Sequence, residues 1–200
     1  QDVDPKVQKA INREQSTEFI HQLVQRAKQR GFHSVNLDLI YGLPHQTTDT
    51  MRSTLAQVMA MDVERISLFN YAHLPSRFAA QRKLRDEWLP SAQQKLALMQ
   101  LATQTLVDHG YEYIGMDHFA KPDDSLSVAQ REGRLHRNFQ GYTTKPESDL
   151  LGFGMTSISM LQNVYAQNHK KLKDFYAAID LFKIFATLSK VTVPFSPISK

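Results

Sequence analysis

The feature that most constrains the fold is the segment over residues 35–44, which is predicted to form one buried β-strand that runs into a turn. Leu37 and Leu39 fall on one face of this strand, and Asn36 and Asp38 on the other, because strand side chains alternate with period two. A strand buried on both faces is apolar throughout, so this pair of polar groups is unusual. We expect the pair at the carboxyl end of the strand, where ligands bind in α/β barrels and in open parallel sheets. Asp38 is therefore a candidate ligand contact; the alternative is a carboxylate that caps the turn or pairs with an arginine.

Helical and extended patterns alternate on either side of this strand. In order, they predict a helix over 16–30, the strand over 35–44, a helix after capping residues at 47–49, a strand over 65–72, an irregular or short helical segment over 73–90, a helix over 91–110, a strand over 111–116, a polar loop over 117–124 and a helix over 164–179. Short connections between alternating helices and strands favour βα repeats and a parallel sheet.

Local signals predict how some of these elements begin, pack and end. Gly31 is expected to terminate the helix over 16–30, and Ser91 with Gln94 forms a capping box at the start of the next long helix. The apolar stripe of that helix is expected to consist of Leu96, Met99, Thr103 and Leu106. Small residues between apolar ones over 151–160 allow close backbone approach to a ligand or to another chain segment.

The charge of the chain is mildly positive, with 24 Lys and Arg against 20 Asp and Glu and a net charge of +4. Basic residues gather in two clusters, which are Arg77, Arg82, Lys83 and Arg85, and then Arg131, Arg134, His136 and Arg137. Acidic residues interrupt both clusters, and no basic stripe is interleaved with aromatic residues. We therefore do not expect nucleic acid as the partner. A small acidic ligand, such as a polycarboxylate, fits the clusters at least as well.

Two further properties of the sequence limit the function. The chain contains no cysteine, which excludes disulfides, thiol nucleophiles and cysteine-ligated iron–sulfur or zinc sites within it. No apolar run approaches the length of a membrane span, and no signal-peptide pattern occurs at the start, so neither secretion nor membrane insertion is expected. The sequence begins at Gln1 without an initiator methionine, and we expect it to be a fragment.

Other side chains are candidates for chemistry, each with a plain alternative. Arg13 is able to hold a carboxylate or a phosphate, although most arginines are simply solvated. Asp117 and His118 suit a divalent ion, but no third ligand follows at a recognisable spacing, so a hydrogen-bonding role is preferred for His118. His136 is able to act as a general acid or base, and a solvated basic loop explains it equally well.

The end of the strand over 65–72 adds to the predicted ligand site. Asn70 and Tyr71 lie there, as Asp38 lies at the end of the preceding strand. The carboxyl ends of parallel strands meet at the same edge of a sheet. Residue chemistry alone therefore predicts part of an α/β barrel or sheet, with a ligand site that contains Asp38 and has Asn70 and Tyr71 as further candidates.

Longer motifs in the chain resemble a known family. They are residues 36–44 (NLDLIYGLP), 69–75 (FNYAHLP), 78–83 (FAAQRK), 115–124 (GMDHFAKPDD), 129–133 (AQREG) and 136–144 (HRNFQGYTT). In these motifs the chain resembles the oxygen-independent coproporphyrinogen III oxidases, which are radical SAM enzymes of haem biosynthesis. The resemblance runs from Gln1 to about Asp180, and its last three motifs are specific to this family rather than to radical SAM proteins at large.

The resemblance implies a fold and a domain organisation. The fold would be α/β, the C-terminal part of a partial (β/α)6 radical SAM barrel with additional α/β elements. Residues 1–75 would be the second part of the barrel, in the order helix, strand, helix, strand. Residues 76–180 would be a family-specific α/β extension that closes the active site. Residues 181–200 no longer resemble the family, and we expect a divergent tail that is frameshifted or unstructured.

The resemblance also implies an activity and its cofactors. The intact protein would be an oxidoreductase, a coproporphyrinogen dehydrogenase, that oxidatively decarboxylates two propionates of coproporphyrinogen III to vinyl groups and gives protoporphyrinogen IX. Its cofactors would be two molecules of S-adenosylmethionine and one [4Fe–4S] cluster held by three cysteines. The implied partners are coproporphyrinogen III and an electron donor, without nucleic acid or membrane. A cytoplasmic protein that is monomeric when intact is expected.

The resemblance carries a set of S-adenosylmethionine contacts onto matching positions, namely Gln1, Arg13, Asp38, Ala72 and Ile158. Arg13 would hold the methionyl carboxylate, and Asp38 would accept hydrogen bonds from an amine or a ribose hydroxyl. Ala72 and Ile158 would contribute backbone groups or shape. No catalytic residue and no metal ligand is expected within this chain.

One departure from the family bears on activity. The C-x3-C-x2-C cysteines of the family are absent, so the chain alone is expected to be inactive. We also expect it to fold poorly or to associate, because a missing half-barrel would expose apolar surface. Two other interpretations stay open, a related radical SAM haem-binding chaperone and a non-enzymatic remnant. Residues 115–124 and 136–144 argue against the chaperone, because they resemble the dehydrogenase.

Overall fold

The computed structural model describes residues 1–138, 141–146, 148–161 and 164–181 of the chain. The chain divides into two compact units, Gln1–Leu135 and His136–Lys200. The predicted divergent tail over 181–200 lies outside the described residues except for Leu181, so it stays a prediction. Among the described helices, none combines the length with the apolar character that crossing a bilayer requires.

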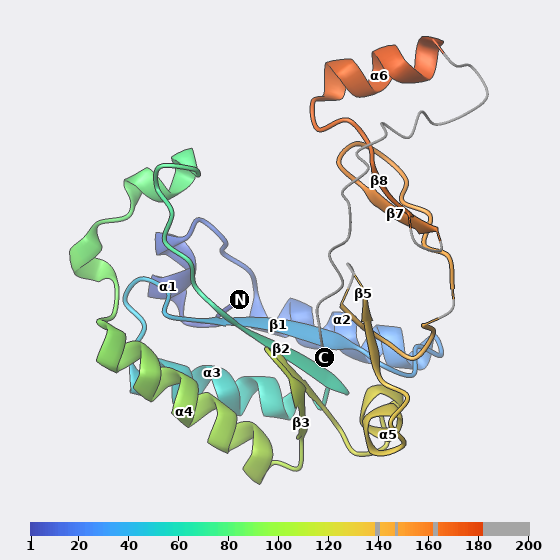
Figure 1. Ribbon diagram of the computed structural model, residues 1–200. Helices are drawn as coiled ribbons and strands as arrows, with labels where there is room; N and C mark the ends of the chain where they lie inside the picture. The colour runs from blue at the N-terminus through green and yellow to red at the C-terminus, as the bar shows by residue number, and fades with distance from the viewer. Residues whose placement is uncertain (139–140, 147, 162–163, 182–200) are drawn as a thin grey trace. The chain divides into compact units, whose positions relative to one another are not determined.

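The first unit contains the predicted helices and strands in the predicted order, and in addition α1, β4 and α5, which were not predicted (Figure 1). Its elements are α1 (Pro5–Ala10), α2 (Thr17–Gln29), β1 (Asn36–Tyr41), α3 (Thr48–Ala60), β2 (Arg65–Asn70), the 3₁₀ helices η1 (Ala79–Lys83) and η2 (Asp86–Trp88), α4 (Ala92–Asp108), β3 (Glu112–Gly115), β4 (His118–Ala120) and α5 (Ser125–Arg131). The segment over 73–90, predicted as irregular or as a short helix, contains the two 3₁₀ helices.

The predicted helix boundaries are confirmed by their caps. The side chains of Ser16, Thr47 and Ser91 each accept a hydrogen bond from a backbone N–H in the first turn of α2, α3 and α4, respectively. Gly31 and Gly110 follow the ends of α2 and α4 with φ of 86° and 83°. Glycine adopts this left-handed conformation without the steric penalty of a side chain, which is why it terminates helices.

The strands of the first unit form one mixed sheet in the order β1-β2-β4-β3. β1 and β2 are parallel, in a register that runs from Asn36 opposite Arg65 to Tyr41 opposite Asn70. This pair confirms the predicted βα repeat. β4, however, runs antiparallel to both β2 and β3, so the prediction of a parallel sheet is wrong beyond β2.

A tight hairpin causes this departure from a parallel sheet. Gly115 (φ 140°) and Met116 (φ 50°) reverse the chain directly after β3, so β4 must run against it. The polar loop predicted over 117–124 is wrong at residues 118–120, which form β4. Three residues are too few for a period-two alternation to be visible in the sequence.

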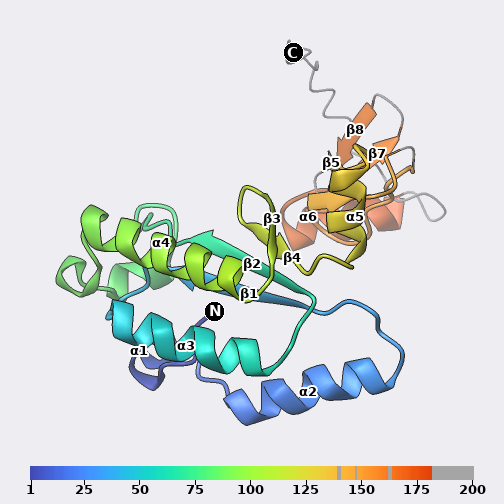
Figure 2. The same cartoon turned by 90° about the horizontal axis from the view of Figure 1, so that it is seen from below.

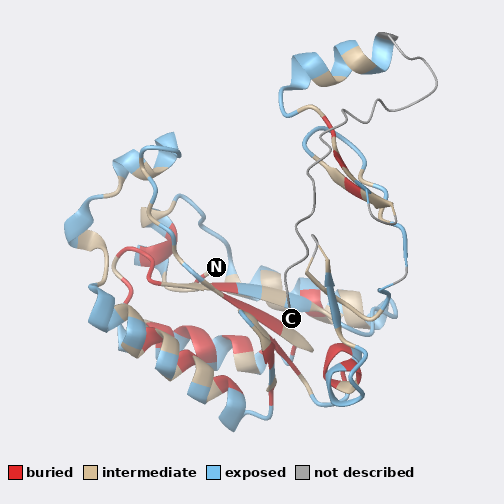
Figure 3. Cartoon of the chain, viewed as in Figure 1, coloured by how far each residue is buried: buried red, intermediate tan, exposed pale blue. Residues whose placement is uncertain are grey.

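A hydrophobic core lies between one face of this sheet and the helices α2, α3 and α4 (Figures 1 and 2). Its buried residues are Val24, Leu39, Met51, Leu55, Val58, Met61, Val63, Ile66, Leu68, Leu98, Ala102, Leu106, Tyr111 and Phe119. Figure 3 shows buried residues gathered where the helices face the strands. The core thus fixes the helices on one side and leaves the other side of the strands for a site.

The buried stripe of α4 differs from the predicted one. Leu98, Ala102 and Leu106 are buried, whereas Leu96 is 50% exposed. Both stripes have helical spacing, and the sequence favoured the one with the larger side chains. Ala102 is small, which lets neighbouring elements approach α4 closely, and this advantage is not visible from side-chain size alone.

The face of β1 away from the core carries the exposed side chains of Asn36 and Asp38, as the alternation predicts. They are the first and third residues of β1, and the strand continues to Tyr41, so the expectation that they lie at its carboxyl end is wrong. The expectation that β1 is a buried strand is wrong for this chain, because Leu39 is the one buried residue among its six. The helices cover one face of β1, and the polar groups occupy the other.

The two edge strands of the sheet, β1 and β3, differ in the hydrogen bonds that their outer edges make. At β3, Gln130 Nε2 of α5 donates a hydrogen bond to Ile114 O at 2.8 Å, and Arg131 binds the carboxylate of Glu112. At β1, the backbone N–H of Ile40 donates to Gln1 O at 3.0 Å. α5 therefore covers part of the β3 edge with side chains, while the N-terminal residue pairs with β1 at one position.

Within the described residues, the second unit contains two antiparallel strand pairs and a helix. They are β5 (His136–Asn138) with β6 (Gly141–Thr143), β7 (Ile158–Leu161) with β8 (Val164–Gln167), and α6 (Leu172–Leu181). The helix predicted over 164–179 is wrong at its start, because residues 164–167 pair with β7 and α6 begins at Leu172. A four-residue strand directly before a helix adds its apolar residues to the helical pattern, and periodicity cannot separate the two.

The close backbone approach predicted over 151–160 is confirmed for a chain segment. A Cβ atom added to Gly152 would lie 2.7 Å from Ile158 O. The backbone of Gly152 also donates to Ser159 Oγ at 3.0 Å. Glycine at this position therefore lets the segment before β7 pack directly against that strand.

Candidate ligand-binding site

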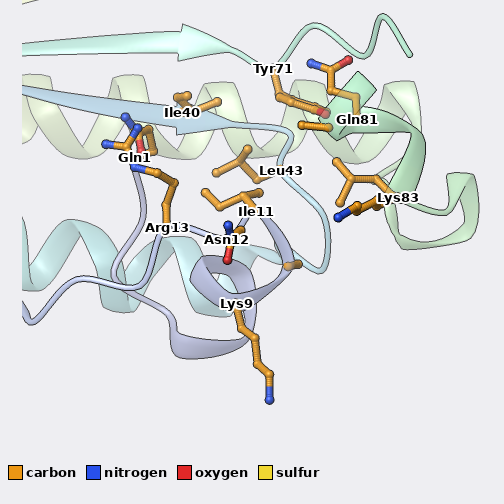
Figure 4. A pocket seen from close by; sticks show the side chains of 13 residues that line it. Gln1, Lys9, Ile11, Asn12, Arg13, Ile40, Leu43, Tyr71, Gln81 and Lys83 are labelled. Atoms are coloured by element: carbon orange, nitrogen blue, oxygen red, sulfur yellow. The ribbon is translucent and has the colours of Figure 1, made fainter. Parts of the chain in front are cut away.

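A cavity of about 570 Å3 lies beyond the carboxyl ends of β1 and β2 (Figure 4). Its lining residues come from the N-terminal segment, from the ends of both strands and from η1. They are Gln1, Lys9, Ala10, Ile11, Asn12, Arg13, Ile40, Leu43, Tyr71, Ala80, Gln81, Lys83 and Leu84. The cavity is therefore where parallel α/β folds place their ligands.

The lining is cationic at its rim and apolar at its centre. Lys9, Arg13 and Lys83 carry positive charge, and the described residues that line the cavity include no aspartate or glutamate. A cavity with cations and no lining carboxylate attracts an anionic ligand. The arrangement suits a molecule with an apolar body and at least one carboxylate or phosphate.

The charges around Gln1 show that three predicted contacts lie near one another. Burial lowers the pKa of the α-amino group of Gln1, and the neighbouring Arg13 guanidinium lowers it further. The carboxylates of Asp2 and Asp38 act in the opposite direction. Gln1, Arg13 and Asp38 are thus close enough to interact electrostatically, although they are far apart in the sequence.

Buried Asp2 anchors the N-terminal segment to α3 and to the end of β1. Its carboxylate accepts hydrogen bonds from Gln46 Nε2 at 2.6 Å and from Thr54 Oγ1 at 2.9 Å. Gln46 in turn accepts from the backbone N–H of Gly42 and donates to Ile40 O. This network fixes Gln1 beside β1. This network is not predictable from the sequence, because a single Asp or Gln carries no periodic signal and its partners lie elsewhere in the chain.

Buried Gln8 positions Arg13 as Asp2 positions Gln1. Its side chain donates to Asp2 O at 2.8 Å and accepts from the backbone N–H of Gln15 at 3.0 Å. Its backbone carbonyl accepts from Arg13 N at 2.9 Å. The turn after α1 is therefore held from both sides, and this holds the backbone of Arg13 at the cavity.

Asp38 lies on the open face of β1 in a chain of polar contacts. Asn36 Nδ2 donates to Asp38 Oδ1 at 2.8 Å, and Ser67 Oγ of β2 donates to Asn36 Oδ1 at 3.1 Å. Asp38 also lines a small cavity, of about 40 Å3, together with Gln1. Its carboxylate keeps further acceptor capacity for an amine or a hydroxyl of a ligand.

The segment after β2 forms the opposite wall of the large cavity. The side chain of Gln81 accepts from Leu74 N at 2.5 Å and donates to Ala72 O at 3.1 Å. Lys95 Nζ donates to Tyr71 O at 3.0 Å and lies 5.9 Å from the centre of the Tyr71 ring. Both side chains fix the backbone where the strand ends.

The structure brings together four of the five predicted contacts. Gln1 and Arg13 line the large cavity, Asp38 shares the small cavity with Gln1, and Ala72 is hydrogen-bonded to the lining residue Gln81. Ile158, the fifth, belongs to β7 in the second unit. All five assignments stay predictions.

The candidates that were named from residue chemistry lie in different parts of the structure. Tyr71 lines the cavity, and Asn70 is the last residue of β2. Asp117 and His118 lie at the β3–β4 hairpin, and the described residues contain no group of three side chains able to hold a metal ion. His136 lies in β5 of the second unit. Of these candidates, Tyr71 alone is a lining residue of the large cavity.

The structure is similar to part of a radical SAM enzyme. A solved structure of coproporphyrinogen III oxidase from Escherichia coli, described as a radical SAM enzyme, matches 90% of this chain with a TM-score of 0.88 and 55% sequence identity. The match covers 42% of that chain. No family model matches the sequence. The α/β fold is thus confirmed as that of a portion of a radical SAM enzyme.

Curated relatives give a more particular result. The chain is 56% identical over 180 residues to the oxygen-independent coproporphyrinogen III oxidases of Escherichia coli and of Synechocystis sp.. It is 49% identical over 180 residues to that of Pseudomonas aeruginosa. Each alignment covers 90% of this chain and 39% of the relative. The chain is therefore homologous to a portion of the oxygen-independent coproporphyrinogen III oxidases, and it spans 39% of the length of these relatives.

The residues present fit one of the two cofactors that a radical SAM enzyme implies. A [4Fe–4S] cluster needs cysteine thiolates, and the chain has none, so its own residues do not fit the cluster. S-adenosylmethionine carries a carboxylate, an amine and ribose hydroxyls. Arg13 at the cationic cavity and Asp38 beside Gln1 offer the donor and acceptor groups that these need.

Proposed function

We propose that this chain is a portion of an oxygen-independent coproporphyrinogen III oxidase and that it forms part of the S-adenosylmethionine site. The intact enzyme would oxidatively decarboxylate two propionates of coproporphyrinogen III to vinyl groups, giving protoporphyrinogen IX for haem biosynthesis. The chain alone would be inactive, because it has no cysteine for the cluster.

The observation that carries this proposal is the proximity of Gln1, Arg13 and Asp38, which are far apart in the sequence. Gln1 lines the large cavity beyond the strand ends together with Arg13, and it lines the small cavity together with Asp38 of β1. Residue chemistry alone offers Asp38 and Arg13 as candidates, and the resemblance assigns all three residues. Their proximity in the fold agrees with one ligand that has both cationic and anionic groups.

Each residue has a role that its chemistry supports. The planar guanidinium of Arg13 would bind the methionyl carboxylate with two parallel hydrogen bonds. Asp38 would accept from the amine or from a ribose hydroxyl, while Ala72 and Ile158 would contribute backbone groups or shape. Asp2 and Gln8 would position Gln1 and Arg13 through the buried hydrogen bonds described above. S-adenosylmethionine would supply the radical chemistry of the reaction.

The remaining features of the intact enzyme are also proposals. Residues 1–75 would be the second part of a partial (β/α)6 barrel and residues 76–180 an extension that closes the active site. The enzyme would use two molecules of S-adenosylmethionine and a [4Fe–4S] cluster, which an electron donor would reduce. It would be a cytoplasmic monomer with no nucleic-acid or membrane partner.

Calorimetric titration of the chain with S-adenosylmethionine tests the proposal. The wild-type chain is expected to bind, and Asp38→Ala is expected to weaken the affinity about tenfold, since it removes a charged hydrogen-bond acceptor. Absence of binding at millimolar ligand would instead indicate a remnant that has lost the site.

A matched control separates the site from a general effect of charge. Asp123 is exposed and lines a different cavity with His33 and Ser34, which precede β1 at its other end. Asp123→Ala removes the same charge and is expected to change the affinity less than twofold. Equal losses in Asp38→Ala and Asp123→Ala would contradict a specific contact at Asp38.

A further inference from the structure

The cationic residues at the large cavity are not equivalent. In Figure 4 the side chain of Arg13 lies beside Gln1, on one side of the cavity, and Lys83 lies on the other side. The Lys83 side chain turns toward Ile11 and Leu43, whereas that of Lys9 extends away from them. The cavity thus has two inward cations, one on each side, and a third cation that points outward.

The space between Arg13 and Lys83 is apolar. Ile11, Ile40 and Leu43 line it, with Asn12 beside Ile11, and the three apolar residues come from the turn after α1, from β1 and from the turn after β1. Apolar side chains favour a hydrocarbon or aromatic body, and a buried polar body would lose hydrogen bonds to water there. A ligand that reaches Lys83 is therefore expected to combine an apolar body with an anionic group.

The position of Lys83 is fixed by the loop that carries it. Gln81, two residues earlier in η1, bridges Leu74 N and Ala72 O with its side chain. Arg82 Nε donates to Pro75 O at 3.0 Å. These two side chains tie η1 back to the end of β2, so the backbone of Lys83 is held over the cavity and only its side chain has to be ordered on binding.

We infer that Lys83 binds a carboxylate of the tetrapyrrole substrate, on the opposite side of the cavity from Arg13. This inference rests on the proposed function and assigns a substrate contact within the same site. The carboxylate of one S-adenosylmethionine suits the fork of Arg13. A second S-adenosylmethionine would bring another carboxylate, but its sulfonium charge, amine and ribose hydroxyls fit the apolar residues between Arg13 and Lys83 less well than a hydrocarbon or aromatic body does. Coproporphyrinogen III combines pyrrole rings with propionate carboxylates, which matches the apolar centre and the second cation.

Binding of coproporphyrin III to the full chain tests the inference. This oxidised and fluorescent form of the substrate keeps the carboxylates, and its affinity can be measured from its fluorescence. Lys83→Met removes the charge and keeps the length of the side chain, and it is expected to weaken binding about fivefold, since an exposed ammonium–carboxylate contact contributes modestly. Lys83→Arg is expected to keep the affinity. Lys9→Met, the matched control, is expected to change it less than twofold.

The outcomes separate this inference from the function on which it rests. Lys83→Met is expected to leave the affinity for S-adenosylmethionine unchanged, which distinguishes a substrate contact from a cofactor contact. If the wild-type chain binds coproporphyrin III and Lys83→Met binds it equally well, the inference is wrong and the proposed function stands. Equal losses in Lys83→Met and Lys9→Met would also overturn it, because they would indicate attraction by net charge. If the wild-type chain binds neither coproporphyrin III nor S-adenosylmethionine, the proposed function fails and the inference with it.

Discussion

At the scale of single residues, a glycine without a side chain helps to shape the wall of the cavity. Gly42 has φ of 87°, and a Cβ atom added there would lie 2.8 Å from Lys95 Cε. The Lys95 ammonium continues past this point to Tyr71 O. Gly42 therefore has two roles. It adopts the left-handed conformation of the turn after β1, and its missing side chain leaves room for Lys95, which binds the backbone at the end of β2.

Gly42→Ala is expected to destabilise the chain by about 2 kcal/mol. About 1 kcal/mol comes from alanine in a left-handed conformation, and about as much from the displaced Lys95 hydrogen bond. Gly110→Ala is the matched control, because Gly110 has φ of 83° and nothing lies within 4 Å of its added Cβ atom. It is expected to cost about 1 kcal/mol. Urea unfolding of both variants measures the difference, and equal losses would show that Lys95 moves without cost.

At the scale of elements, one carboxylate joins α2, β1 and β2. Glu64, directly before β2, accepts from the backbone N–H of Val35 at 2.9 Å and pairs with Lys28 Nζ of α2 at 2.7 Å. Burial raises the pKa of Glu64, but the hydrogen bonds from Lys28 and Val35 and the charge of Lys28 outweigh it and hold the pKa below its ordinary value of 4.5. The ionised form is therefore favoured by folding.

The stability of the chain is expected to fall in acid for this reason. A carboxyl group whose pKa is lowered by folding stabilises the fold above its unfolded pKa and loses this effect as the pH falls through its folded pKa. The thermal midpoint should therefore drop below about pH 4.5, the ordinary value for Glu64. Glu64→Gln is expected to cost about 1 kcal/mol at pH 7 and to make the drop shallower. Glu87→Gln, at an exposed pair with Arg85, should leave the pH profile unchanged, and an unchanged profile in Glu64→Gln would refute the assignment.

How far the sequence predicts this fold depends on how local each signal is. The caps at Thr47 and Ser91 and the alternation in β1 act within a few residues, and the structure confirms them. β4 was missed because its pairing with β2 and β3 is decided by the hairpin, not by its own three residues. Asp2 was missed because its partners Gln46 and Thr54 lie 44 and 52 residues away, and no local pattern indicates such a contact. For the site, residue chemistry alone gave Asp38 and named Arg13 as a weak candidate, and the resemblance was needed for Gln1.

At the scale of the whole molecule, the five predicted contacts of S-adenosylmethionine are divided between the two units. All lining residues of the large cavity belong to the unit Gln1–Leu135. The fifth predicted contact, Ile158, belongs to the other unit, where Gly152 packs against its backbone. The first unit thus contains the predicted charged contacts, and the second contains a predicted contact of shape alone.

A chain that ends after Leu135 is therefore expected to bind S-adenosylmethionine within about fivefold of the full chain. The charged groups contribute most of the binding energy, and a contact of shape at Ile158 contributes on the order of 1 kcal/mol at most. Calorimetric titration of both chains measures the ratio, and circular dichroism verifies that the shorter chain is folded. A complete loss of affinity in a folded chain 1–135 would show that the second unit is part of the site.

The unequal edges of the four-stranded sheet have a consequence for assembly. Gln130 of α5 binds a backbone acceptor of β3, while the outer edge of β1 is engaged at Ile40, whose N–H donates to Gln1 O and whose carbonyl accepts from Gln46 Nε2. Among the described residues, no further backbone segment pairs with this edge of β1. Additional strands can then add by backbone pairing at β1 and are hindered at β3. If the β1 edges of two chains pair in a symmetric contact, the dimer has no further β1 edge to which a third chain could add. Self-association through this sheet would therefore stop at a pair and would not propagate into a filament.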